Sequence, residues 1–173
     1  ASGALTIPAT IEGFPVTSIG RSAFGGCRSL TTITLPDSIT SIGGAAFTVC
    51  GSLTSIMIAD GVTSIGENAF DACSSLTSIT IPDSVTSIGE KAFSRCYKLT
   101  SITIGDGIIN IGDRAFDRCG NLSAVTFLGD APKNVSNVFK GSEPILYRTK
   151  NSIGWKQLWS GRPVRLLSEK NKN

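Results

Sequence analysis

The chain of 173 residues contains no histidine, and this absence excludes several kinds of chemistry. Ser-His-Asp and Cys-His catalysis both require an imidazole base, and imidazole is a common zinc ligand. The C-x-x-C pair that is typical of zinc sites is also missing. Acid and base chemistry would therefore depend on carboxylates alone. We predict a protein that is not an enzyme and that needs no cofactor or metal.

Long apolar segments are absent as well. No run approaches the roughly 20 residues that a membrane-spanning helix needs, so we expect no membrane insertion. The first residues show neither the basic nor the apolar part of a signal peptide. They begin almost inside a repeat, and we expect the chain to be a piece of a longer parent protein.

What the chain does contain is a repeat of 23 residues. Such fixed spacing predicts a solenoid, because one repeat cannot bury its own apolar face and must stack on the next. Two columns of large apolar residues define the period: Leu30, Leu53, Leu76, Leu99 and Leu122, and Phe24, Phe47, Phe70, Phe93, Phe116 and Phe139.

One repeat, residues 76–98, predicts the path of a single coil. Ile79 and Ile81 share one face of a short strand because side chains alternate faces at period two. A turn follows, and then Val85 and Ile88 indicate a second short extended stretch. Residues 90–96 have apolar side chains at helical spacing and predict one helical turn. Strands of successive coils should pair in parallel.

We therefore predict one domain, a mainly β repeat solenoid with short helical turns and a C-terminal cap. Residues 1–139 would form the solenoid of about five repeats plus a partial one, and residues 140–173 the cap and polar tail. In the cap we expect strands near residues 145–147 and 164–167, and a short helix that Ser152 caps and that carries two tryptophans. The first repeat is irregular, with five extra residues before Phe14.

The motifs L-T-x-I-x-I-P, V-T-S-I-G and A-F-x-x-C recur in order from about Leu5 to Phe139. This pattern resembles the BspA-like class of bacterial leucine-rich repeat. The resemblance implies a right-handed leucine-rich-repeat superhelix with a parallel sheet. It also implies an extracellular or surface-displayed binding module, since some members are adhesins toward host proteins or other bacteria. It carries over no catalytic residues.

Cysteine and aspartate also recur at the 23-residue interval, and such columns can indicate disulfides or a calcium site. The cysteines Cys27, Cys50, Cys73, Cys96 and Cys119 share one inward position, so their Cβ vectors run parallel and we expect buried free thiols instead of disulfides. The acids Asp37, Asp60, Asp83 and Asp106 share a turn position. We interpret them as turn formers, and calcium bridging between successive carboxylates is the alternative.

The outward strand positions form the candidate ligand-binding face. They are rich in hydroxyls and nearly free of charge, which suits an extended protein or glycan ligand held by many weak hydrogen bonds. The alternatives are plain β-propensity of threonine, and an ice-binding array whose regularity Met57 spoils. The candidate residues are Thr32, Thr34, Ser55, Met57, Ser78, Thr80, Ser101 and Thr103.

Charge is divided unevenly along the chain. Residues 1–132 hold 7 basic and 11 acidic side chains, whereas residues 133–173 hold 9 basic and 2 acidic ones. Basic groups among aromatics suit nucleic acid or an anionic glycan, but a cationic tail around a packed aromatic cap explains them more simply. We expect no nucleic-acid partner. The secondary candidate patch is Tyr147, Trp155, Trp159 and Arg162.

Three hypotheses for function follow. The leading one is a monomeric, non-enzymatic interaction module of a secreted or surface-displayed bacterial protein, adhesin-like and binding protein or glycan. The second is a structural spacer or accessory domain of a larger, truncated parent enzyme. The third is an enzyme that uses aspartate or glutamate, which a ladder of equivalent turn acids does not favour because a carboxylate pair needs unequal environments.

Overall fold

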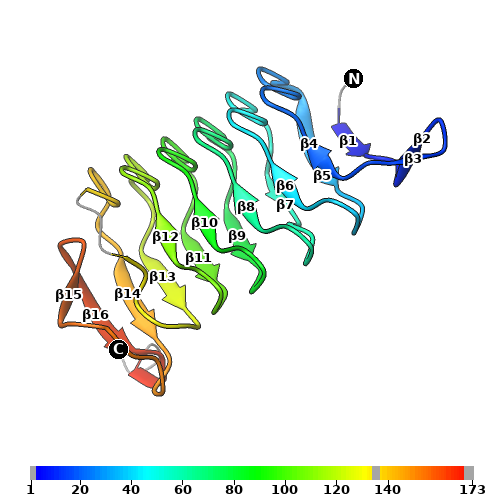
Figure 1. The fold of residues 1–173 in the computed structure, drawn as a ribbon. Helices are drawn as coiled ribbons and strands as arrows, with labels where there is room; N and C mark the ends of the chain where they lie inside the picture. The colour runs from blue at the N-terminus through cyan, green and yellow to red at the C-terminus, as the bar shows by residue number, and fades with distance from the viewer. Residues whose placement is uncertain (1–2, 134–136, 170–173) are drawn as a thin grey trace.

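The computed structural model describes residues 3–133 and 137–169. The chain winds into a stack of coils, one for each 23-residue repeat, with the two termini at opposite ends of the stack (Figure 1). The described residues contain no α-helix, and one short 3-10 turn, η1 (Leu167–Glu169), follows the last strand. The solenoid prediction is confirmed.

The longer strands of successive coils lie side by side and run parallel. Ser78 pairs with Ser101 and Ile79 with Ile102, so equal positions of neighbouring repeats face each other. An antiparallel strand, β15 (Leu158–Trp159), closes the C-terminal edge. In chain order the parallel strands are β1 (Gly3–Thr6), β5 (Leu30–Thr34), β7 (Ser55–Ile56), β9 (Ser78–Ile81), β11 (Ser101–Ile104), β13 (Ala124–Phe127), β14 (Ile145–Arg148) and β16 (Arg162–Leu166).

A second parallel sheet of two-residue strands forms the next side of each coil, as the Val85 and Ile88 pattern predicts. The glycine after each of these strands has a steric reason: a Cβ on Gly89 would lie 2.5 Å from the backbone nitrogen of Glu67 in the preceding coil. The strands are β4 (Ser18–Ile19), β6 (Ser41–Ile42), β8 (Ser64–Ile65), β10 (Ser87–Ile88) and β12 (Asn110–Ile111).

The third side of each coil differs from the prediction, because residues 90–96 form turns and not a helical turn. Lys91 and Arg95 adopt left-handed backbone conformations, with φ of 51° and 59°. Their N–H groups, like that of Phe93, point along the stack, and Phe93 donates to the Ala115 carbonyl of the next coil at 2.8 Å. The apolar spacing is the same as in a helix, but these hydrogen bonds join coils instead of closing a helix.

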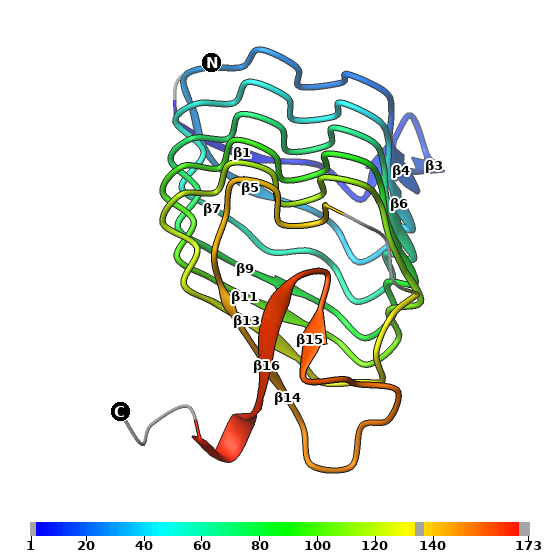
Figure 2. The same ribbon diagram turned by 90° about the vertical axis from the view of Figure 1, so that its left-hand side faces the viewer.

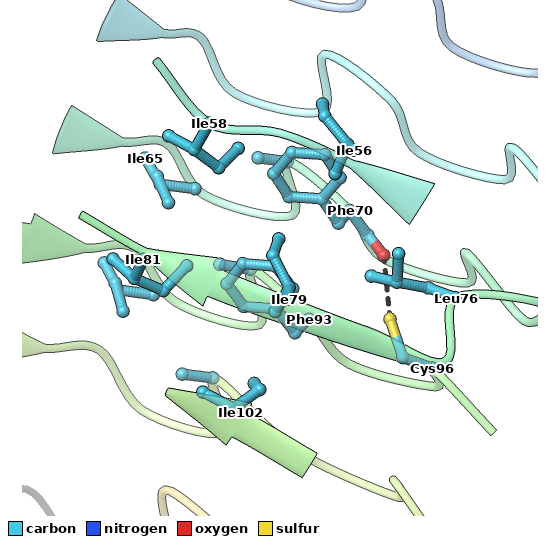
Figure 3. Packing of buried hydrophobic residues seen from close by; sticks show 14 of the residues in the cluster. Ile56, Ile58, Ile65, Phe70, Leu76, Ile79, Ile81, Phe93, Cys96 and Ile102 are labelled. Carbon is cyan, nitrogen blue, oxygen red and sulfur yellow. Dashed lines mark hydrogen bonds between the residues drawn. The ribbon is translucent and has the colours of Figure 1, made fainter. Parts of the chain in front are cut away.

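Stacked phenylalanines form the centre of the core. The ring centroids of Phe70 and Phe93 lie 5.1 Å apart with planes within 6° of parallel, and the other four successive pairs lie at 5.2 to 5.5 Å. Figure 3 shows these two rings among the inward isoleucines, including Ile79 and Ile81. Each residue of a column therefore contacts its equivalent in the coils before and after it.

The cysteine column bonds successive coils together. Cys96 is buried, and its Sγ donates to the carbonyl oxygen of Phe70 at 3.3 Å (Figure 3). Ser142 continues the column with a hydroxyl that donates to the Phe116 carbonyl at 2.7 Å. Buried free thiols are confirmed at Cys50, Cys73, Cys96 and Cys119. The prediction is wrong for Cys27, which is exposed because it belongs to the first, incompletely covered coil.

The irregular first repeat folds into a small hairpin beside the stack. β2 (Thr10–Ile11) pairs antiparallel with β3 (Phe14–Pro15), and the hairpin projects from the N-terminal coils (Figure 1). Both Ile11 and Phe14 are exposed on it. The extra residues thus leave the register of the neighbouring coils unchanged.

The C-terminal end of the stack is covered by the segment after residue 139, where β14, β16 and β15 continue the sheet in a different orientation (Figure 2). The predicted strands at 145–147 and 164–167 are present. The predicted helix is wrong: Ser152 donates to the Thr149 carbonyl at 2.8 Å instead of capping a helix, and Trp159 belongs to β15. The division of the domain at residue 139 stays a prediction, since the sheet runs across it.

Candidate ligand-binding face

The candidate face is the outward side of β5, β7, β9 and β11. On these strands the alternate isoleucines are buried, and the hydroxyl-bearing residues between them point away from the core. The threonines just before β7 and β11 have a structural role: Thr54 Oγ1 donates to the Thr31 carbonyl and Thr100 Oγ1 to the Thr77 carbonyl, each at 3.1 Å. These hydroxyls therefore bond neighbouring coils to each other, and their donors are not available to a ligand.

The eight candidate residues lie together on this face. Ser55 stands beside Thr32 in the sheet register, and Thr103 stands beside Thr80. Five are exposed and three are half-buried. No hydroxyl among them makes a hydrogen bond within the described part of the chain, so all seven hydroxyls are available to a ligand. The exposed members are Thr34, Ser55, Met57, Ser78 and Thr80.

The parallel sheet is interrupted in the middle of this face. β7 is the edge of a three-stranded sheet and β9 the edge of a six-stranded one, so the two strands face each other without a ladder. The N–H of Thr77 reaches the Thr54 carbonyl at 3.4 Å, whereas the equivalent bond one coil later is 2.9 Å. The coils rejoin where Ser84 Oγ donates to the Val62 carbonyl at 2.7 Å. Between these two points no backbone hydrogen bond joins the two coils in the described structure, and we call the coils splayed there.

A groove of about 720 Å³ opens at this splay, and we call it the β7–β9 groove. This volume is in the range of about 300 to 1,000 Å³ that is typical of ligand sites. Met57 projects at its edge and is 81% exposed. The lining residues are Ser55, Ile56, Met57, Ile58, Asp60, Ser78, Ile79, Thr80, Ile81, Pro82, Asp83, Ser84 and Leu128. The groove thus gathers four of the eight candidate residues, and the other four flank it on β5 and β11.

Part of this groove could be foreseen from breaks in the repeat. Met57 replaces the threonine of its column and was among the predicted residues. Ala59 stands where the neighbouring coils have Pro36 and Pro82. Leu128, which the sequence analysis missed, stands where the preceding coil has Gly105, and the same comparison of columns would have found it.

In the aspartate column, one carboxylate bonds to the next coil, and a further aspartate in the last coil does the same. Asp83 Oδ1 accepts the N–H of Asp106 in the next coil at 3.0 Å, and Asp130 Oδ1 accepts that of Ile153 at 2.7 Å. Asp37, Asp60 and Asp106 accept no equivalent bond within the described residues. Across residues 3–133 and 137–169, no three acidic or cysteine side chains gather closely enough to hold a metal ion.

The buried thiols are poor nucleophiles. Burial raises the pKa of Cys50 to about 11 and that of Cys119 to about 12. Burial likewise raises the pKa of Cys73 and of Cys96. Because the thiolate is the reactive form, these four side chains remain protonated at neutral pH. They act in the core as small apolar groups with a hydrogen-bond donor.

The secondary candidate patch lies in the C-terminal cap, where three of its four residues contribute aromatic rings. Trp159 is buried and packs edge-on against Phe139, the last ring of the stack, at 6.1 Å. Trp155 lies 4.8 Å from Phe127, and its Nε1 donates to the Gly129 carbonyl at 3.2 Å. These rings close the stack, as the packing interpretation predicts.

The remaining members of that patch are less accessible than a binding surface requires. Tyr147 is buried beside Thr126 in the sheet register. Arg162 is half-buried, and its Nη1 lies 3.6 Å from Glu143 Oε1. A binding role for these four residues stays a prediction.

The family model of the BspA type leucine-rich repeat region matches residues 7–146 in six copies. Within the described ranges, no helix is both long and apolar enough to cross a bilayer. Among curated proteins none matches this chain.

Solved structures of bacterial repeat proteins share the fold. A leucine-rich repeat protein of T. pallidum is 31% identical with a TM-score of 0.71, covering 82% of this chain and 73% of that one. A leucine-rich cell surface protein of Faecalibacterium prausnitzii is 32% identical with a TM-score of 0.75, covering 95% of this chain and 48% of that one. The pneumococcal vaccine antigen PcpA is 27% identical with a TM-score of 0.69, covering 86% of this chain and 41% of that one. This chain spans less than half the length of the last two proteins. Because the family model covers most of its residues, the chain belongs to the BspA type leucine-rich repeat family.

Proposed function

We propose that the chain is a non-enzymatic binding module of a surface-displayed or secreted bacterial protein, and that it holds a protein ligand on the candidate face. The β7–β9 groove carries this proposal. It is the place where a regular stack departs from its own repeat, and it opens among candidate residues whose hydroxyls make no hydrogen bond within the described residues.

The chemistry of the face supports binding over catalysis. The groove lining has carboxylates at Asp60 and Asp83, and both lie at equivalent exposed turn positions. A catalytic carboxylate pair needs one member in an environment that holds its proton, and equivalent exposed positions do not supply one. Hydroxyls with an exposed methionine instead suit adaptable recognition, because Met packs against ligands of varied shape.

The relatives support a surface location. The F. prausnitzii neighbour is described as a cell surface protein, and PcpA as a vaccine antigen. Adhesion to host proteins would follow from such a location. A free monomer in solution, as predicted above, would leave the candidate face open to ligand.

The test is binding of the purified chain to immobilised extracellular-matrix proteins, with glycans as a parallel panel. Met57→Asn should weaken protein binding at least tenfold, which corresponds to about 1.4 kcal/mol, because it removes the apolar contact without adding charge. Ile109→Asn is the matched control, because Ile109 is an exposed apolar residue beside β12, away from the candidate face. Equal loss in both variants would contradict the assigned face, and no binding by the unaltered chain to any protein or glycan would favour the spacer role.

A further inference from the structure

We infer that the β7–β9 groove takes an extended, cationic peptide segment, which adds to the exposed sheet edge as a strand. This inference rests on the proposed function and specifies the ligand. It combines three properties of the groove: two facing sheet edges without a ladder, an acidic rim, and an exposed methionine at the entrance.

The unpaired edges favour a peptide backbone as the partner. β7 contains only Ser55 and Ile56, and residues 57–60 lie outside any described ladder, whereas the equivalent residues of the next coil pair through Ile81 with Ile104. Edge strands present N–H and C=O groups that an added strand satisfies, and peptide-binding domains use this mode of recognition. Residues 55–60 span about 20 Å at roughly 3.3 Å per residue, which allows a segment of about six residues.

The charge of the groove favours a cationic segment. Asp60 and Asp83 are both exposed and line it, and none of its described lining residues is a lysine or arginine. Within the described residues the Asp60 carboxylate accepts no hydrogen bond and forms no ion pair, so it can pair with a ligand cation. Residues 1–132 carry a net negative charge, with 7 basic and 11 acidic side chains. This charge also attracts a basic ligand.

The experiment uses three labelled hexapeptides and the whole chain, with binding followed by fluorescence anisotropy. The probes are an alternating Lys-Val peptide, the same peptide N-methylated at alternate residues, and an alternating Glu-Val peptide. We expect the Lys-Val peptide to bind best. N-methylation should weaken binding at least tenfold, because it removes the donors that pair with a sheet edge. The Glu-Val peptide should bind at least tenfold more weakly.

Two variants locate the bound peptide. Asp60→Asn should weaken binding of the Lys-Val peptide about three- to fivefold, the upper end of the range for one exposed ion pair. Asp37→Asn is the matched control, because Asp37 occupies the same turn position one coil earlier and does not line the groove. It should change binding less than twofold. Saturating peptide should also slow amide hydrogen exchange in residues 55–60.

Three other sets of results would overturn the inference. Equal effects of the two variants, or equal binding of the methylated peptide, would overturn strand addition in favour of diffuse charge attraction. A chain that binds matrix proteins through Met57 but none of the hexapeptides would overturn this inference while leaving the proposed function intact. Binding to glycans alone, or a dimer that Met57→Asn dissociates, would assign the groove to another occupant and also overturn it.

Discussion

Removing one ring from the middle of the phenylalanine stack tests the architecture most directly. Phe93 is fully buried, and its ring lies 5.1 Å from Phe70 and 5.5 Å from Phe116. Phe93→Ala removes a ring that contacts both neighbouring coils, in a column that cannot shift without breaking register. Truncating a buried phenylalanine costs about 3 to 5 kcal/mol, and we expect the full range here.

The end of the stack supplies the matched comparison. Phe24 is only half-buried and has a single ring neighbour, Phe47, at 5.3 Å. Phe24→Ala should therefore cost about 1 to 2 kcal/mol, less than half of the central loss, because part of the ring already meets water. Both truncations are chemically identical, so the difference between them reports position in the stack.

Urea unfolding followed by circular dichroism measures both losses. With an m-value of about 2 kcal/mol per molar urea, the Phe93→Ala midpoint should fall by roughly 2 M. A repeat array can lose its ends first, so hydrogen exchange of each coil should accompany the urea curve. Equal losses for Phe93→Ala and Phe24→Ala, or a central loss under about 1 kcal/mol, would refute the stacked-column account.

Further predictions concern thiols, backbone strain and an ion pair. In the native protein at pH 8, a disulfide reagent should modify Cys27 alone, with the four buried cysteines reacting only on unfolding; a second fast thiol would contradict their burial. Ala72→Gly should raise the free energy of unfolding by about 0.5 to 1 kcal/mol in urea titration, since Ala72 has a φ of 59°, and Gly26→Ala at the same register position should lower it. Arg95→Met should cost about 1 kcal/mol in the same assay, because it leaves the buried Asp71 carboxylate without the guanidinium that binds it in two places; an unchanged midpoint would refute that role.

The repeat made most of the fold predictable. The parallel register and the inward columns follow from residues that recur at a fixed interval, and the aromatic cap was expected where that recurrence stops. The helical turn at residues 90–96 could not be predicted correctly, because one helical turn and a pair of left-handed turns place apolar side chains on the same side. Which of them forms is decided by hydrogen bonds to the next coil, as between Phe93 and Ala115, and a single repeat contains only one of the partners.

The candidate site was predictable in composition but not in shape. The hydroxyl-rich face and the break at Met57 are visible in the aligned repeats. The splay between β7 and β9, the free carboxylate of Asp60 and the reach of Leu128 into the groove depend on how the coils sit on one another, above all at the β7–β9 contact. Small differences in backbone path accumulate across that contact, and neither repeat specifies them alone.

The sequence by itself determined a stack of coils and the residues that fill it, because burial at a fixed period leaves only one way to cover the apolar columns. The tertiary structure alone decided where that stack opens. A ladder between coils forms only when every backbone group along both edges comes into reach together, and at β7 and β9 it does not. The repeat therefore fixes the architecture, and the place where two coils part provides the candidate site.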